Sequence, residues 1–156
     1  MSKEDRPDIM NALTFFDPEI AERVLWLRDF AWDNCPGANE LIYDNYNALA
    51  IGWSLTEKSG AVVCNIAIYR SNQNIQFGFF AGEELPDPEN RLIGQGKQYR
   101  YLVVKDLDQF PQDYMRRLIA QARDILQNKM KDAGTTITGR TILKSVSANK
   151  RTIHRK

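Results

Sequence analysis

The segment LIGQGKQYRYLVV, residues 92–104, places two glycines and two cations directly before an apolar alternation. A phosphate-binding loop of the Walker type needs Gly-Lys followed by Ser or Thr, with a strand before the loop and a helix after it. Here Lys97 is followed by Gln98 and a strand-like run, so no helix N-terminus is available to hold an anion. The pattern therefore favours a turn that enters a strand, and it leaves weaker anion binding by Lys97 and Arg100 as the alternative.

Acidic residues share one face of the first helix that the sequence predicts. At 100° per residue, four of them fall within an arc of about 80°, and carboxylates displayed in this way can hold iron or another hard cation. A solvated helix face is the competing interpretation, because carboxylates spread over about four turns make a sparse ligand set. These acids are Glu19, Glu22, Asp29 and Asp33. We predict no cofactor, and iron at these residues is the alternative.

Nucleophilic catalysis and tight zinc binding find little support in the residue types. The only histidine, His154, lies in a basic C-terminal stretch that would have to fold back to build a Ser-His-Asp or Cys-His arrangement. Cys35 and Cys64 have no metal-ligand spacing, and two free cysteines suit a reducing cytoplasm. Acid–base work by a carboxylate such as Glu40 stays open, because burial can raise a carboxyl pKa. We therefore favour a non-enzymatic protein.

The elements that must position these residues follow from composition and periodicity. The chain has 156 residues, 43% hydrophobic and 26% charged, which suits one packed soluble domain. No stretch has the roughly 18 apolar residues needed to cross a bilayer, so we expect no membrane contact. Apolar spacing predicts a helix over 18–34 and another from about 108–111 to 130. Between them, short links indicate antiparallel strands at 40–46, 48–55, 61–69, 75–80 and 98–104.

The predicted strands have one apolar face and one face of mainly small residues. Two helices need an apolar surface to cover, so we predict an α+β two-layer sandwich: an N-terminal helix, an antiparallel sheet of about five strands and a C-terminal helix. The covered face carries residues such as Leu49, Ile51, Val62, Cys64 and Phe77. The other face would form a shallow trough that suits a ligand, unless another segment or a second subunit fills it. Its expected lining is Tyr43, Tyr69, Phe80 and Arg100.

Residues 81–97 form a long polar connection, and long ordered loops in compact domains are often functional. We place the domain at 17–134 and interpret 135–156 as a basic, flexible tail, with an extra strand at 141–146 as the alternative. From residue 133 onward there are six Lys and Arg residues and no acids. These cations can contact phosphates, but no aromatic platform accompanies them, so nucleic-acid binding is disfavoured.

The stretch CPGANELIYDNYNALAIGW carries a resemblance to a known family. A helix ending in Pro-Gly-Ala, followed by Glu, an apolar residue and Tyr, resembles the YdhG-like family of uncharacterised bacterial domains, over about residues 20–133. The residues that carry it are Pro36, Gly37, Ala38, Glu40, Ile42 and Tyr43, with Gly96, Lys97, Arg100, Leu102 and Val104 later. The chain departs from the family at 45–49, where members often have Met-Pro-x-aromatic, and at Asn74, where many have histidine.

The resemblance implies a frataxin-like α+β fold, and at least one relative has been described as an iron chaperone; it supplies no established catalytic residues. We therefore expect a non-catalytic cytoplasmic module, monomeric or homodimeric, that binds a small molecule or a protein through the open sheet face and the 81–97 loop. The alternatives are a frataxin-like iron carrier and a small enzyme that uses carboxylates and tyrosines. The expected ligand-binding residues are Tyr43, Tyr69, Lys97, Arg100 and Glu40.

Overall fold

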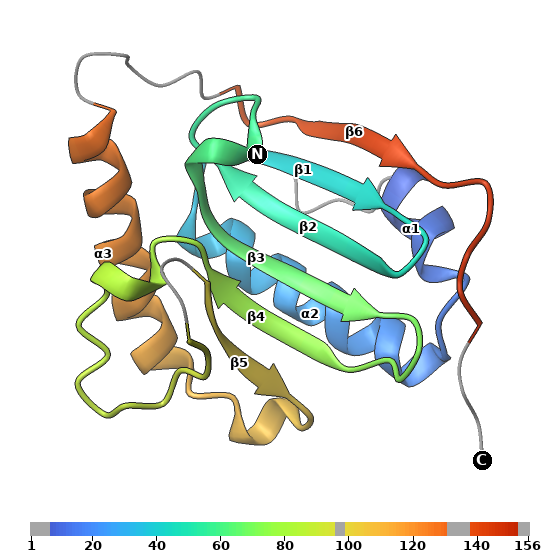
Figure 1. The fold of residues 1–156 in the computed structure, drawn as a ribbon, viewed down its shortest axis with the longest axis horizontal. Coiled ribbons are helices and arrows are strands. Elements are labelled where there is room, and N and C mark those ends of the chain that lie inside the picture. Colours follow the sequence, from blue (N-terminus) through green and yellow to red (C-terminus); the bar gives the residue numbers. More distant parts are fainter. Residues whose placement is uncertain (1–6, 96–98, 131–137, 153–156) are drawn as a thin grey trace.

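The computed structural model describes residues 7–95, 99–130 and 138–152. It shows an α+β fold in which helices pack on one face of a sheet (Figure 1). The described helices are α1 (Pro7–Leu13), α2 (Pro18–Asn34) and α3 (Gln112–Lys129). The strands are β1 (Asn39–Asp44), β2 (Ala48–Ser54), β3 (Val62–Tyr69), β4 (Ile75–Phe79), β5 (Arg100–Val104) and β6 (Thr141–Val146).

The sheet has the strand order β5-β4-β3-β2-β1-β6. The five strands expected from the sequence are present, and each pairs antiparallel with its neighbour along the chain. The prediction of an antiparallel sheet of about five strands holds for these strands, but the whole sheet is mixed, because β6 adds a sixth strand parallel to β1. Residues 141–146, which we interpreted as part of a flexible tail, therefore form an edge strand. The helix α1, which the sequence analysis missed, buries Ile9, Ala12 and Leu13 in the core.

The core lies between the helices and the apolar face of β2, β3 and β4. Leu49, Ile51, Cys64 and Phe77 are fully buried there, as the alternation predicts. Val62 differs from the prediction, because the pairing of β2 with β3 shifts by one residue between Trp53 and Ser54. Such a bulge reverses the side-chain alternation beyond it. The neighbouring Val63 consequently joins the core, while the side chain of Val62 lies on the opposite face, over Gly52.

A buried ion pair joins α2 to β1. Arg28 donates from Nε to Oε2 of Glu40 (2.6 Å) and from Nη2 to Oε1 (3.0 Å), and the two side chains are 1% and 0% exposed. Thr141 of β6 donates its hydroxyl to Oε1 of the same carboxylate (2.7 Å). Glu40 pairs across the sheet with Trp53, so its side chain points toward the helices. The carboxylate is thus a structural group between three elements. We had expected Glu40 to bind a ligand at the surface, but its side chain is buried.

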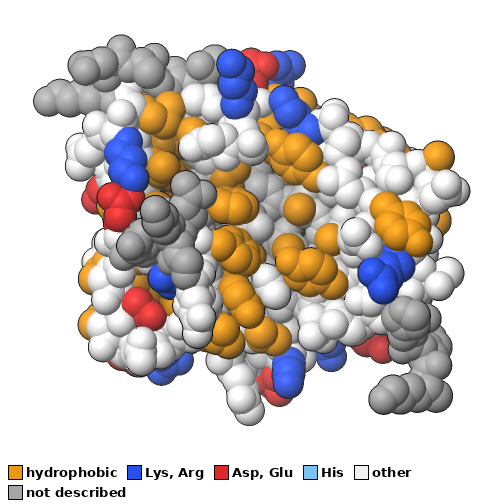
Figure 2. All heavy atoms as spheres, in the orientation of Figure 1, with side chains coloured by type: hydrophobic (Ala, Val, Ile, Leu, Met, Phe, Trp, Pro, Cys, Tyr) orange, Lys and Arg blue, Asp and Glu red, His pale blue; other side chains and the backbone are white. Residues whose placement is uncertain are grey.

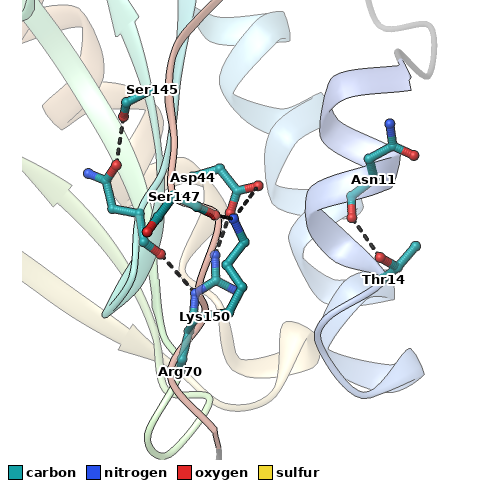
Figure 3. A network of polar contacts seen from close by, with 8 residues as sticks. Asn11, Thr14, Asp44, Arg70, Ser145, Ser147 and Lys150 are labelled. Carbon is teal, nitrogen blue, oxygen red and sulfur yellow. Dashed lines mark hydrogen bonds and ion pairs between the residues drawn. The ribbon is translucent and has the colours of Figure 1, made fainter.

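A second polar cluster holds the C-terminal segment against the ends of β1 and β3 (Figure 3). Asp44 forms an ion pair with Arg70, and its other oxygen lies 3.5 Å from Nζ of Lys150. The Arg70 guanidinium also donates to the carbonyl of Asn45 (2.9 Å) and lies over the ring of Phe16, 5.1 Å from its centroid. These contacts attach the described residues beyond β6, up to residue 152, to the body of the protein.

The substitution Glu40→Gln should destabilise the protein by about 3–5 kcal/mol, because it removes the carboxylate charge that pairs with the buried Arg28 guanidinium. Urea unfolding of the wild type and the variant measures this difference in free energy. Asp113→Asn is the matched control, since Asp113 pairs with Arg116 on the surface and is 86% exposed; we expect it to cost less than about 1 kcal/mol. Equal effects of the two substitutions would contradict the assignment of Glu40 to the core.

Candidate functional site

The face of the sheet that the helices leave bare is the candidate site, and we call it the open face. Figure 2 views this side of the molecule and shows hydrophobic side chains gathered over the middle of the sheet. The cross-strand pairing places two continuous rows of side chains on it. One row is Leu41, Gly52, Asn65, Gly78 and Tyr101; the next is Tyr43, Ala50, Ala67, Gln76 and Val103. The face also includes Ala48, Val62 and Tyr69.

The middle of the open face has a floor of small side chains between tyrosines. Ala50 lies directly between its cross-strand partners Tyr43 and Ala67, while Ala48 is opposite Tyr69. This part of the open face is low, because each alanine side chain is only a methyl group. Tyr69 is 38% exposed. None of the residues that make up the open face is charged, so contacts there depend on apolar surface, aromatic rings and neutral hydrogen bonds.

A cluster of aromatic rings covers the β4–β5 side of the open face. The ring of Tyr99 lies over Gly78 so closely that a Cβ at that glycine would be 2.5 Å from the tyrosine oxygen. Tyr99 stacks on Tyr101, with centroids 5.5 Å apart and an interplanar angle of 21°, and its centroid is 5.2 Å from that of Phe80. Its hydroxyl donates to Oε1 of Gln76 (3.2 Å). The absence of a side chain at Gly78 thus creates the space that Tyr99 fills.

The titration behaviour of the buried groups argues against reactive roles for them. Burial raises the pKa of Tyr99, and the nearby Tyr69 and Tyr101 add to this effect, although a hydrogen bond from Asn65 acts in the opposite direction. The phenol therefore stays protonated. Burial and the neighbouring Cys35 raise the pKa of Cys64 well above its ordinary value, with the two sulfur atoms 3.9 Å apart. That thiol is therefore not an activated nucleophile.

The expected ligand-binding residues do not all meet on the open face. Tyr43 and Tyr69 do, on either side of β2. Glu40 points to the opposite face, as described above, and Arg100 pairs with Phe79, whose side chain is in the core. Arg100 therefore lies on the helix side of the edge strand, where its Nη1 donates to the carbonyl of Tyr99 (3.0 Å). Lys97 lies outside the described residues. The expected ligand-binding set did not include Asn65, Gln76, Tyr99 and Tyr101, which also lie on this side of the sheet.

The middle of the 81–97 loop is anchored on α3 through the carboxylate of Asp87. Oδ1 of Asp87 accepts hydrogen bonds from the Tyr114 hydroxyl and from the amide of Arg91 (3.0 Å), and Oδ2 accepts from the amide of Leu92 (3.0 Å). Tyr114 in turn accepts from the amide of Glu89 (3.1 Å). Desolvation alone would raise the pKa of Asp87, but these hydrogen bonds outweigh it and leave the pKa below its ordinary value. The loop is thus a built element with its own polar centre.

A pocket of about 430 Å³ lies at the edge of the open face, where β3 begins and β4 ends. Val62 and Phe80 line it together with Leu126 and Lys129 of α3. The Lys129 ammonium forms an ion pair with Glu84 at the start of the loop. Phe80, which the sequence analysis expected near the trough, is 42% exposed and belongs both to this pocket and to the aromatic cluster. The pocket and the open face therefore form one continuous surface.

The acidic residues proposed for iron all lie on α2 and are exposed: Glu19, Glu22, Asp29 and Asp33. Within residues 7–95, 99–130 and 138–152, no three or more His, Cys, Asp or Glu side chains come close enough to hold a metal ion. No helix in the part of the chain that the structure describes is long and apolar enough to span a membrane.

No family model, curated protein or solved structure matches the chain. The resemblance to the YdhG-like family therefore stays a prediction. The function is therefore inferred from the geometry of the surface, above all from the open face and its aromatic cluster.

Replacing Gly78 by alanine should drive Tyr99 off the open face, because the added Cβ would lie 2.5 Å from the tyrosine oxygen and 2.6 Å from a ring carbon. Freed from burial, the Tyr99 phenol should titrate near its ordinary pKa of about 10, which NMR on 13C-labelled tyrosine measures. Gly60→Ala is the control, since nothing lies within 4 Å of a Cβ there. An unchanged Tyr99 titration in Gly78→Ala would contradict this packing.

The Asp87 anchor should make the stability depend on pH. A carboxyl whose pKa is lower in the folded state stabilises the fold at pH values above its unfolded pKa of about 3.9, and this contribution is lost as the pH falls through the folded pKa. Asp87→Asn should therefore cost about 1–2 kcal/mol at pH 7, and the difference from wild type should disappear in acid. Urea unfolding across this pH range measures it; a difference that persists below about pH 2 would contradict the anchor.

Proposed function

We propose that the protein is a non-catalytic, cytoplasmic binding module of the YdhG-like kind that takes a small molecule or a protein segment on its open face. The observation that carries this proposal is the composition of that face. Tyrosine rings and small side chains occupy a surface without charged residues, while the helices cover only the other side of the sheet. Apolar surface with a few polar groups is typical of ligand sites.

The chemistry of the ionisable groups supports binding over catalysis. An enzyme of this size that relied on carboxylates would need one of them in a cleft, unpaired and with a shifted pKa. The buried carboxylates Glu40 and Asp44 are instead paired with Arg28 and Arg70. The phenol of Tyr99, the most shielded polar group of the aromatic cluster, is held in its protonated form by burial. A role that needs only surface complementarity fits these groups best.

The 81–97 loop contributes to the proposed site by holding its rim. The loop begins beside Phe80 and its described part ends shortly before Tyr99, so it connects two members of the aromatic cluster. Its anchor on Tyr114 of α3 fixes its middle. We therefore assign the loop a positioning role: it keeps Phe80 and the end of β5 in place at the border of the open face.

A blocked open face tests the proposal. Protein purified from its own cells is examined by native mass spectrometry for a bound species, first as wild type and then as Ala50→Arg, which places a long charged side chain on the half-buried floor. We expect the bound species to disappear from this variant. Ala120→Arg, at an exposed position of α3, is the matched control and should keep it. A species retained equally by both variants would overturn the proposal.

A further inference from the structure

The strand β5 forms one edge of the sheet (Figure 1), and part of its outer side is unpaired. Near its start, Tyr101 exchanges two backbone hydrogen bonds with Ile93 of the 81–97 loop, with N–O distances of 2.7 and 2.9 Å. Tyr101 therefore turns its amide and carbonyl away from β4. Alternate residues of a strand point these groups the same way, so the N–H and C=O of Val103 also point outward. Neither group has a hydrogen-bond partner among the residues that the structure describes.

The loop turns away from this edge before it reaches Val103. In an antiparallel ladder that continued beyond the pair formed by Ile93, Arg91 would lie opposite Val103. The amide of Arg91 instead donates to Oδ1 of Asp87 (3.0 Å), as part of the anchor on α3 described above. The anchor thus draws the chain away from β5, and the next position of the ladder stays open.

A pocket of about 310 Å³ lies beside the unpaired part of β5. Val103 and Arg91 both line it, which places the pocket at the open position of the ladder. Its apolar wall consists of residues on the helix side of the sheet and at the start of α3: Leu102, Val104, Phe110 and Pro111. Side chains alternate along a strand, so an extended chain laid along β5 finds backbone partners at Val103 and an apolar wall for the side chains on either side of that pair.

The charged residues that line the pocket favour an acidic side chain on the segment that binds there. They are Arg91, Lys105 and Asp106. Arg91 pairs with Glu89, and Oδ1 of Asp106 accepts the amide of Asp108 (3.0 Å). Lys105 is exposed and forms no ion pair with any residue in the described part of the chain. A carboxylate placed beside Lys105 would form a cross-strand pair of opposite charges, which is favourable.

A second copy of the chain does not fit this edge. Two-fold antiparallel pairing of two β5 strands about Val103 would place Lys105 of one copy opposite Tyr101 of the other. The outer side of Tyr101 is already occupied by Ile93. β5 ends at Val104, so a pairing centred farther along the chain has no strand left to use. The occupant is therefore a separate, narrow segment that meets only the last residues of β5.

We infer that the outer edge of β5 binds an extended segment of a partner protein, which adds a short strand antiparallel to β5 and in line with Ile93. One residue of the segment exchanges two backbone hydrogen bonds with Val103, its two neighbours place apolar side chains in the pocket, and an acidic residue pairs with Lys105. In strand addition of this kind, main-chain hydrogen bonds give affinity and pockets for alternate side chains give specificity. The site uses the edge of the sheet, so it does not rest on the function proposed for the open face.

Peptides that differ in the position of one methyl group test the inference. The probe is acetyl-TEVTV-amide; antiparallel to β5, its glutamate lies beside Lys105, its second threonine lies opposite Val103 and its valines point into the pocket. N-methylation of that threonine removes the N–H that donates to the Val103 carbonyl, whereas N-methylation of the first valine blocks an N–H that points away from β5.

The 15N-labelled full chain is titrated with the three peptides. We expect the unmodified peptide to shift the backbone amides of Val103 and Lys105, the N-methyl-threonine form to bind at least roughly tenfold more weakly, and the N-methyl-valine form to bind like the unmodified peptide. Equal affinity of the two methylated peptides, or no shifts at millimolar peptide, would overturn the inference.

A charge reversal tests the assigned direction of the segment. Lys105→Glu, at an exposed position, should weaken binding of the unmodified peptide roughly two- to fivefold and should favour a peptide in which lysine replaces the glutamate. Lys58→Glu, in the turn between β2 and β3, is the matched control and should leave both affinities unchanged. A Lys105→Glu variant that keeps the preference of the wild type for the glutamate peptide would overturn the inference.

Discussion

The ion pair between Arg28 and Glu40 determines which side chains reach each face of the sheet. Side chains alternate along a strand, so a shift of β1 by one residue would exchange its two faces. Such a shift would expose Ile42 and bury Tyr43, and it would separate the carboxylate from the guanidinium of α2 and the hydroxyl of Thr141. Because a buried charge without a partner is strongly unfavourable, the pair opposes such a shift together with the burial of Ile42. The tyrosine on the open face thus depends on an ion pair on the opposite side.

The periodic elements of the fold could be predicted from sequence, and the non-local ones could not. The helices α2 and α3 and the first five strands follow from apolar spacing and short links. β6 did not stand out, because its partner β1 is about 100 residues away along the chain and its own residues are half-buried or exposed. The contacts that hold it, from Thr141 to Glu40 and from Lys150 to Asp44, join residues whose proximity no local pattern reveals. The alternation of apolar and polar residues does not indicate the bulge beside Val62 either.

The same alternation explains the partial prediction of the site. Tyr43 and Tyr69 were placed on the open face, where the structure has them, but Glu40 was grouped with Tyr43 although the two are three positions apart in the strand. Residues an odd number apart in a regular strand lie on opposite faces, so this error could have been avoided. The expectation for Arg100 has the same flaw. Arg100 lies between Tyr99 and Tyr101 in the sequence, so its side chain points to the face opposite theirs. Gly78 gave a weak signal that another group lies close to it, because glycine within a strand often marks such an approach.

The residue types of the open face are compatible both with contact with water and with binding. A wide surface of leucine and isoleucine would invite non-specific association, whereas tyrosine and glutamine side chains combine apolar area with polar atoms. The packing of Tyr99 over Gly78 also conceals backbone that would otherwise be bare. Asn65 adds a hydrogen bond to the Tyr99 hydroxyl, so its carboxamide helps to hold this ring over the sheet.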